Sequence, residues 1–148
     1  MPLDTAPIPR PALWLGLAGL IPFLGLALSS FALGGHRGDL AAAALAYYGV
    51  AILSFMGGCR WGFAAAGLGE GASLRLLGLS VLPALWAWGA LLLVPAPFDL
   101  MALAVGFVAL YAADLRLTAE GGAPVWWPAL RLPLTGGAVA SLVVASFA

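Results

Sequence analysis

The chain has 148 residues, of which 64% are hydrophobic and 8% are charged. Because about one residue in four of a soluble domain is charged, so few charges cannot cover a globule, and the composition excludes a water-soluble monomer. Six arginines balance six acidic residues and there is no lysine, so we expect no nucleic-acid partner. Because there is one cysteine, we expect no internal disulfide. We also expect no metal and no cofactor.

The charged residues divide the chain into long uncharged segments. A helix needs roughly 20 apolar residues to cross about 30 Å of hydrocarbon. Five segments approach this length, at about residues 11–33, 40–66, 75–94, 98–117 and 131–148. None alternates like a barrel strand, and lipid cannot satisfy an open backbone, so all are predicted helices. The sequence predicts an all-α integral membrane bundle of five transmembrane helices, with residues 1–148 forming a single domain.

Short connections between these spans place successive helices antiparallel. The first connection, residues 34–39, contains the sole histidine, His36. We interpret His36 as a solvated loop residue rather than a catalytic one. Residues 1–30 also have features of a signal peptide, but their uncharged stretch is longer than a usual signal core. We therefore interpret that stretch as the first span.

The arginines predict the orientation of the bundle. With five spans, the N-terminus shares a side of the membrane with the second and fourth connections. The arginines on or close to this side are Arg10, Arg60, Arg75, Arg116 and Arg131, and the opposite side has Arg37. Because positive residues favour the cytoplasmic side, we expect a cytoplasmic N-terminus and an external C-terminus.

The second span combines small residues with a charge. Ser54, Gly58, Gly62 and Ala66 recur at every fourth position and therefore share one helix face, which favours close packing against another helix. The same region also contains Arg60. The glycines at 57 and 58 have an alternative interpretation, a loosened helix with carbonyls exposed near Arg60.

Two features of the later spans bear on helix shape and charge. Pro83 removes one backbone hydrogen bond from the third span and predicts a kink, with Ser80 available to satisfy a freed carbonyl. Asp114 lies toward the same membrane face as Arg60. An ionised group there costs about 2.5–3.5 kcal/mol, so a mutual ion pair is expected. The functional interpretation of this intramembrane charge pair is an anion or proton site. The structural interpretation is an ion pair that fixes the register of the two helices.

The segment before the fifth span is rich in tryptophan. Trp126 and Trp127 are predicted to form an interfacial anchor together with Arg131. Arg131 begins the fifth span at the membrane face near Asp114, so it is also an alternative partner for that carboxylate.

The glycine, arginine and tryptophan pattern of residues 52–62 resembles a family of small multi-pass membrane proteins of unknown function that includes mitochondrial transmembrane protein 69. Residues 15–23, 80–83 and 126–135 fit the same family pattern. Cys59 stands where an aliphatic residue is expected and gives no reason to predict thiol chemistry. The resemblance implies a protein of the bacterial inner membrane with mitochondrial relatives, and it implies no activity.

Two functions remain open. The first is a non-enzymatic structural or assembly protein that contacts the lipid bilayer and associates with itself or with a larger membrane complex. The second is a small carrier or binder of an anionic metabolite or lipid headgroup that uses Arg60 and Asp114. An enzyme is not expected, because neither Ser54 nor Ser80 has a histidine or lysine to activate it.

Overall fold

The computed structural model describes residues 7–148, and this part of the chain folds into six α-helices without a strand. The helices are α1 (Arg10–Ala18), α2 (Leu20–Leu33), α3 (Gly35–Ala65), α4 (Leu74–Leu93), α5 (Phe98–Ala119) and α6 (Trp127–Ala145). Since α1 and α2 form one continuous candidate span, the described residues contain five segments long and apolar enough to cross a membrane. The predicted all-α bundle of five transmembrane helices is confirmed.

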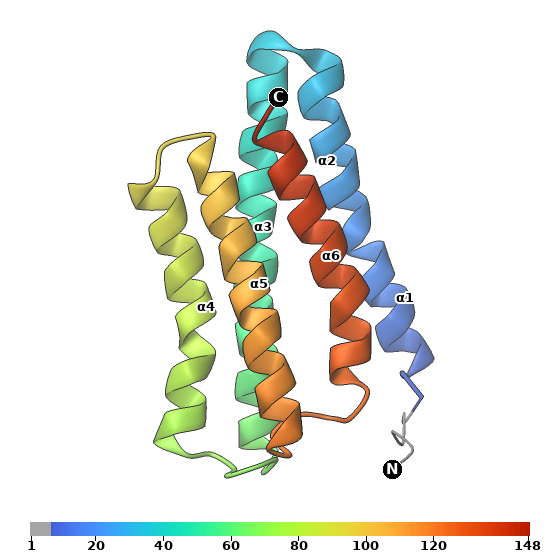
Figure 1. Ribbon diagram of the computed structural model, residues 1–148, viewed down its shortest axis with the longest axis vertical. Coiled ribbons are helices and arrows are strands. Elements are labelled where there is room, and N and C mark those ends of the chain that lie inside the picture. The colour runs from blue at the N-terminus through green and yellow to red at the C-terminus, as the bar shows by residue number, and fades with distance from the viewer. Residues whose placement is uncertain (1–6) are drawn as a thin grey trace.

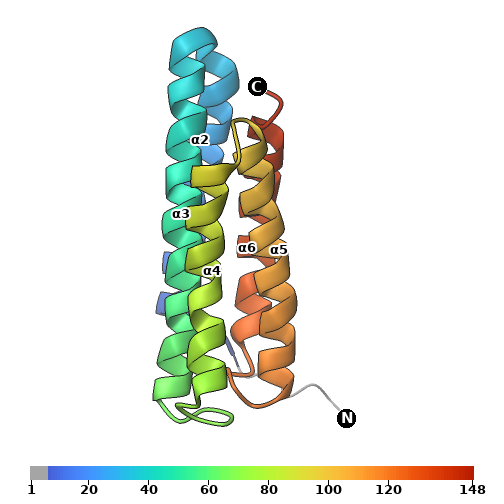
Figure 2. The ribbon, with the colours of Figure 1, turned by 90° about the vertical axis from the view of Figure 1, so that its left-hand side faces the viewer.

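The helices run up and down in one bundle (Figure 1). In the view at a right angle to it, α3 lies beside α4, and α5 lies beside α6 (Figure 2). The start of α1, the α3–α4 loop and the α5–α6 loop lie at one end of the bundle (Figure 1). We name this the arginine-rich end, because Arg10, Arg75 and Arg116 lie there.

The first span is interrupted at Gly19, where α1 ends and α2 begins. Pro22 contributes to the interruption, because it has no N–H to donate to the carbonyl of Ala18 one turn earlier. The Tyr48 hydroxyl donates a hydrogen bond of 2.9 Å to the carbonyl of Gly19. The predicted single span 11–33 is therefore two helices. The hydrogen bond from Tyr48 connects the break between them to α3.

The connection predicted at residues 34–39 is wrong, because α3 already begins at Gly35. Gly34 and Gly35 make the turn, with positive φ values of 59° and 48° that favour glycine. His36 is therefore an exposed residue in the first turn of α3 instead of a loop residue. The turn is tight, since a Cβ at Gly38 would lie 2.6 Å from the carbonyl oxygen of Ser30.

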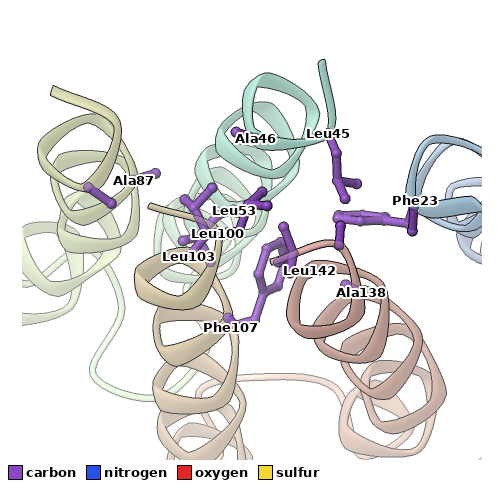
Figure 3. Close-up of a cluster of buried hydrophobic side chains, with 14 of the residues drawn as sticks. Phe23, Leu45, Ala46, Leu53, Ala87, Leu100, Leu103, Phe107, Ala138 and Leu142 are labelled. Atoms are coloured by element: carbon purple, nitrogen blue, oxygen red, sulfur yellow. The ribbon is translucent and has the colours of Figure 1, made fainter. Parts of the chain in front are cut away.

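Large apolar side chains fill the centre of the bundle (Figure 3). Phe23 of α2 and Phe107 of α5 meet edge to face, with ring centroids 5.8 Å apart. Many large apolar side chains lie instead on the outer surface, among them Leu28, Phe31, Leu85, Trp88, Leu92, Val105 and Val144. Such a surface is costly in water and suits contact with lipid.

One hydrogen bond joins α4 to the beginning of α5. Trp86 Nε1 donates to the carbonyl of Ala102 over 2.8 Å. The Trp86 ring covers Gly106, where a Cβ would lie 2.6 Å from the ring. This contact depends on the indole N–H of Trp86 and on the absence of a side chain at Gly106.

Trp86→Phe is expected to lower the free energy of unfolding by about 1 kcal/mol, because it removes this donor and part of the ring contact. Denaturant unfolding of the detergent-solubilised protein measures the loss. Trp88→Phe is the control, since Trp88 is 62% exposed on the same helix. Equal losses in the two variants would contradict a specific role for Trp86.

Candidate functional site

Three charged side chains from three helices meet inside the bundle near the arginine-rich end. Arg60 lies five residues before the end of α3, and Asp114 lies five residues before the end of α5. Arg131 lies four residues after the start of α6. At 1.5 Å per residue, all three are about 6–8 Å inside their helix ends. They are therefore at a similar depth.

Asp114 binds both arginines, one with each carboxylate oxygen. Arg60 Nη1 donates to Asp114 Oδ1 at 3.2 Å, and Arg131 Nε donates to Asp114 Oδ2 at 3.0 Å. The exposed fractions are 8% for Arg60 and 1% for each of the other two residues. We name these three residues the Asp114 cluster. It ties α3 and α6 to α5 through charge-assisted hydrogen bonds.

The Asp114 cluster carries one positive charge in excess, because two guanidinium groups share one carboxylate. Arg131 Nη2 is buried and has no hydrogen-bond partner within residues 7–148. The same is true of Trp127 Nε1 and Thr135 Oγ1. The Arg131 guanidinium carbon lies 6.0 Å from the centroid of the Trp127 ring, within reach of a cation–π attraction. The site thus contains buried hydrogen-bond donors that have no acceptor in residues 7–148.

The structure brings the expected Arg60 and Asp114 together and adds Arg131, which the sequence allowed only as an alternative partner. Of the residues in the predicted interfacial anchor, Arg131 is buried in the bundle beside Asp114. Trp127 is buried as well. It is 5% exposed and packs edge to face on Phe63, with centroids 4.9 Å apart. Trp126 is half-buried and contacts Trp127.

The predicted small-residue face of α3 makes no close contact inside the described bundle. Gly58, Gly62 and Ala66 are exposed, Ser54 is half-buried, and a Cβ at either glycine would meet nothing within 4 Å. Gly57 makes the close approach instead.

Gly57 faces the turn of α4 that contains the predicted kink residues Ser80 and Pro83. A Cβ at Gly57 would lie 2.5 Å from the carbonyl oxygen of Ser80 and 3.4 Å from Pro83. The Ser80 hydroxyl donates to the carbonyl of Leu77 at 2.6 Å. It therefore does not donate to the carbonyl of Leu79, which has no helical donor because Pro83 lacks an N–H.

Hollows flank the Asp114 cluster on two sides. A cavity of about 290 Å³ is bordered by α1, α2, α3, α5 and α6 and is lined by Trp127 and Arg131; we name it the α1–α6 cavity. On the other side, Arg60 lines two adjoining hollows of about 460 and 300 Å³ between α4 and α5, which we name the α4–α5 groove. Arg131 thus borders the hollow on one side of the cluster, and Arg60 borders those on the other side.

Acidic, histidine and cysteine side chains are scattered in the described part of the chain. No three of them gather there in a way that could hold a metal ion.

Comparison with known proteins places the whole bundle in one family. A family model described as protein of unknown function, DUF3429, matches residues 8–147. Transmembrane protein 69 of Xenopus tropicalis is 42% identical in an alignment of 142 residues that covers 91% of this chain and 53% of the relative. Transmembrane protein 69 of Mus musculus is 34% identical in an alignment of 141 residues that covers 92% of this chain and 55% of the relative.

The chain therefore spans about half the length of these relatives. No solved structure matches it. Because the family model covers all five membrane segments and the Asp114 cluster, the chain belongs to the DUF3429 family of proteins of unknown function.

Proposed function

We propose that this multi-pass membrane protein is a non-enzymatic binder of an anionic group, supplied by a lipid headgroup or a metabolite, at the Asp114 cluster. The observation that carries the proposal is the pair of buried arginines on one buried carboxylate. An unbalanced charge in a membrane interior is expensive, and ionisable groups there usually serve a function. An anion would balance the charge.

The residues have distinct roles in this proposal. Arg60 and Arg131 supply the positive charge that attracts the anion, while Asp114 holds their guanidinium groups in place. On the α4–α5 side, Arg75 and Arg116 line the same hollow as Arg60 and give it a positive rim, which Glu120 partly offsets. A positive rim raises the local concentration of an anion before it binds.

We also propose that the protein lies in the bacterial inner membrane with its arginine-rich end in the cytoplasm. The unequal distribution of arginines supports this orientation. A reporter that is active only outside the cytoplasm, fused to the C-terminus, tests it. Activity of the reporter is expected, and an inactive but stably expressed fusion would contradict the orientation.

Arg60→Gln is expected to weaken anion binding at least tenfold while the protein still folds, because Asp114 keeps Arg131 and the cluster becomes neutral. A tenfold loss of affinity corresponds to about 1.4 kcal/mol of binding free energy. The full chain is placed in phosphatidylcholine nanodiscs, phosphatidylglycerol is titrated in, and native mass spectrometry measures the bound lipid. Titration with inorganic phosphate distinguishes a soluble anion from a headgroup.

Arg37→Gln is the matched control for this experiment. Arg37 is exposed in the first turn of the same helix, at the opposite end of the bundle from the cluster. Its replacement is expected to leave binding unchanged. If Arg60→Gln binds both probes as well as the unaltered protein does, the proposed function is wrong.

Assembly with other membrane chains is the second candidate function. Its support is the outward face of α3, where Gly58 and Gly62 leave room for a neighbouring backbone and the exposed Phe55 and Trp61 lie close by in sequence. The mass of the particle in mild detergent and cross-linking in cells test this candidate. A monomer without any cross-linked partner would contradict it.

A further inference from the structure

The α1–α6 cavity has a polar end and an apolar interior. Its volume is about 290 Å³, close to the roughly 300 Å³ at which small-molecule sites begin. Apart from Trp126, Trp127, Arg131, Cys59 and Met56, its lining is aliphatic, glycine or phenylalanine. A fully water-soluble anion would gain little from such walls.

Two of the unpartnered donors belong to residues that line this cavity. Trp127 Nε1 and Arg131 Nη2 are both buried without an acceptor in residues 7–148. Leaving a buried donor unsatisfied costs about 1–3 kcal/mol, and more for a charged group. Both groups donate and neither accepts, so the missing partner has acceptor oxygens. A phosphate or a carboxylate meets this need and also balances the charge of Arg131.

The apolar part of the cavity extends from these donors toward the middle of the membrane. Ala138 lines it and lies seven residues beyond Arg131 on α6, which is about 10 Å deeper along the helix. Phe23 and Phe107 line it as well and belong to the central core (Figure 3). The cavity thus matches a molecule with an anionic head and an apolar chain.

We infer that the α1–α6 cavity binds an anionic membrane lipid, with headgroup oxygens accepting from Trp127 Nε1 and Arg131 Nη2 and one acyl chain extending toward Ala138. The inference rests on the proposed function and specifies its ligand and the side of the cluster that holds it. The α4–α5 groove is the rival location. Its exposed Arg75 and Arg116 suit a soluble anion better than an acyl chain.

Trp127→Phe tests the head of the site, because it keeps an aromatic ring on Phe63 and removes the N–H. We expect phosphatidylglycerol occupancy in phosphatidylcholine nanodiscs to fall about fivefold, the equivalent of one hydrogen bond. Trp88→Phe makes the same chemical change on the outer surface of α4 and is expected to leave occupancy unchanged. Equal occupancy in Trp127→Phe and the unaltered protein would overturn the inference.

Ala138→Leu tests the chain of the lipid, because it fills the deep end of the cavity. We expect it to reduce phosphatidylglycerol binding at least fivefold. Ala12→Leu, at another wall of the cavity, replaces it if thermal unfolding shows that Ala138→Leu is misfolded. Unchanged lipid binding in the folded variant would overturn the inference.

These variants separate the failure of the inference from that of the proposed function. If Arg60→Gln loses binding while Trp127→Phe and Ala138→Leu retain it, the anion lies elsewhere on the cluster. The inference then fails and the proposed function stands. If inorganic phosphate binds and displaces phosphatidylglycerol in Ala138→Leu as in the unaltered protein, the ligand is a soluble anion and the inference again fails. If Arg60→Gln binds normally, both fail.

Discussion

Replacing Asp114 with asparagine is expected to lower the free energy of unfolding by about 3–5 kcal/mol, the range for breaking a buried ion pair. Asparagine has nearly the same shape, so the change removes the negative charge and little packing. Arg60 and Arg131 would then face each other as buried cations without a counter-ion. Denaturant unfolding in detergent, followed by circular dichroism, measures the loss.

Glu120→Gln is the control for the removal of a carboxylate. Its side chain is 56% exposed and 3.9 Å from Arg75, so this surface pair contributes at most about 1 kcal/mol. The combined variant Asp114→Asn, Arg60→Gln and Arg131→Gln has no charge at the site and is expected to recover a large part of the lost stability. If Asp114→Asn is no worse than Glu120→Gln, the cluster does not hold the bundle together.

The position of Asp114 explains why one residue has so large an expected effect. It lies on α5, and its two oxygens reach α3 on one side and α6 on the other. Apolar contacts between membrane helices gain little from the hydrophobic effect, because lipid is also apolar. The two charged hydrogen bonds therefore contribute, together with close packing, to holding α3 and α6 against α5 at one depth. The same arrangement leaves Arg131 Nη2 without a hydrogen-bond partner in residues 7–148.

The spans and the depth of the Asp114 cluster could be predicted from sequence. Both follow from distance along a helix axis, since each residue advances the chain by 1.5 Å. Counting from the charged ends of the spans places Arg60 and Asp114 at similar depth, as the structure has them. The same count made Arg131 an alternative partner. It could not show that one carboxylate binds both arginines.

The rotation of each helix about its axis was harder to predict. Membrane helices are apolar on all sides, so hydrophobic periodicity does not identify the inner face. Within the bundle, the close approach is therefore at Gly57, one residue or about 100° around α3 from the predicted small-residue face. Arg60 is the residue that identifies the inner face of α3. Once it faces Asp114, the residues three before and four after it, Gly57 and Ala64, share its buried side.

The burial of Trp127 inside the bundle could not be predicted for a related reason. Tryptophan before a membrane span is typical of the interface, and that tendency predicted an anchor. In the structure α6 begins at Trp127, and the indole lies inside between Phe63 and Arg131. The start of a helix and the cation beside the ring depend on neighbouring helices, which the local sequence does not specify. The unpartnered Trp127 Nε1 was therefore beyond prediction.

Gly57 and Gly58 offer a direct test of this rotation, because the same substitution is expected to have opposite effects at neighbouring positions. At Gly57 a methyl group would lie 2.5 Å from the backbone oxygen of Ser80, so α3 and α4 must separate. The expected loss is about 1–3 kcal/mol of unfolding free energy, as for other overpacked sites. At Gly58 the methyl group meets open space, and alanine favours the helix over glycine by up to about 1 kcal/mol.

Denaturant unfolding of Gly57→Ala and Gly58→Ala, both prepared as monomers in detergent, compares the two positions without interference from assembly through the outer face of α3. We expect the first variant to unfold at lower denaturant concentration than the unaltered protein and the second at equal or higher concentration. The reverse order would mean that α3 is rotated by about one residue, with Gly58 against α4 and Gly57 toward lipid. Because Gly57 and Arg60 share a face, that rotation would also turn Arg60 away from Asp114. The stability of two alanine variants therefore tests the orientation on which the Asp114 cluster and its proposed ligand depend.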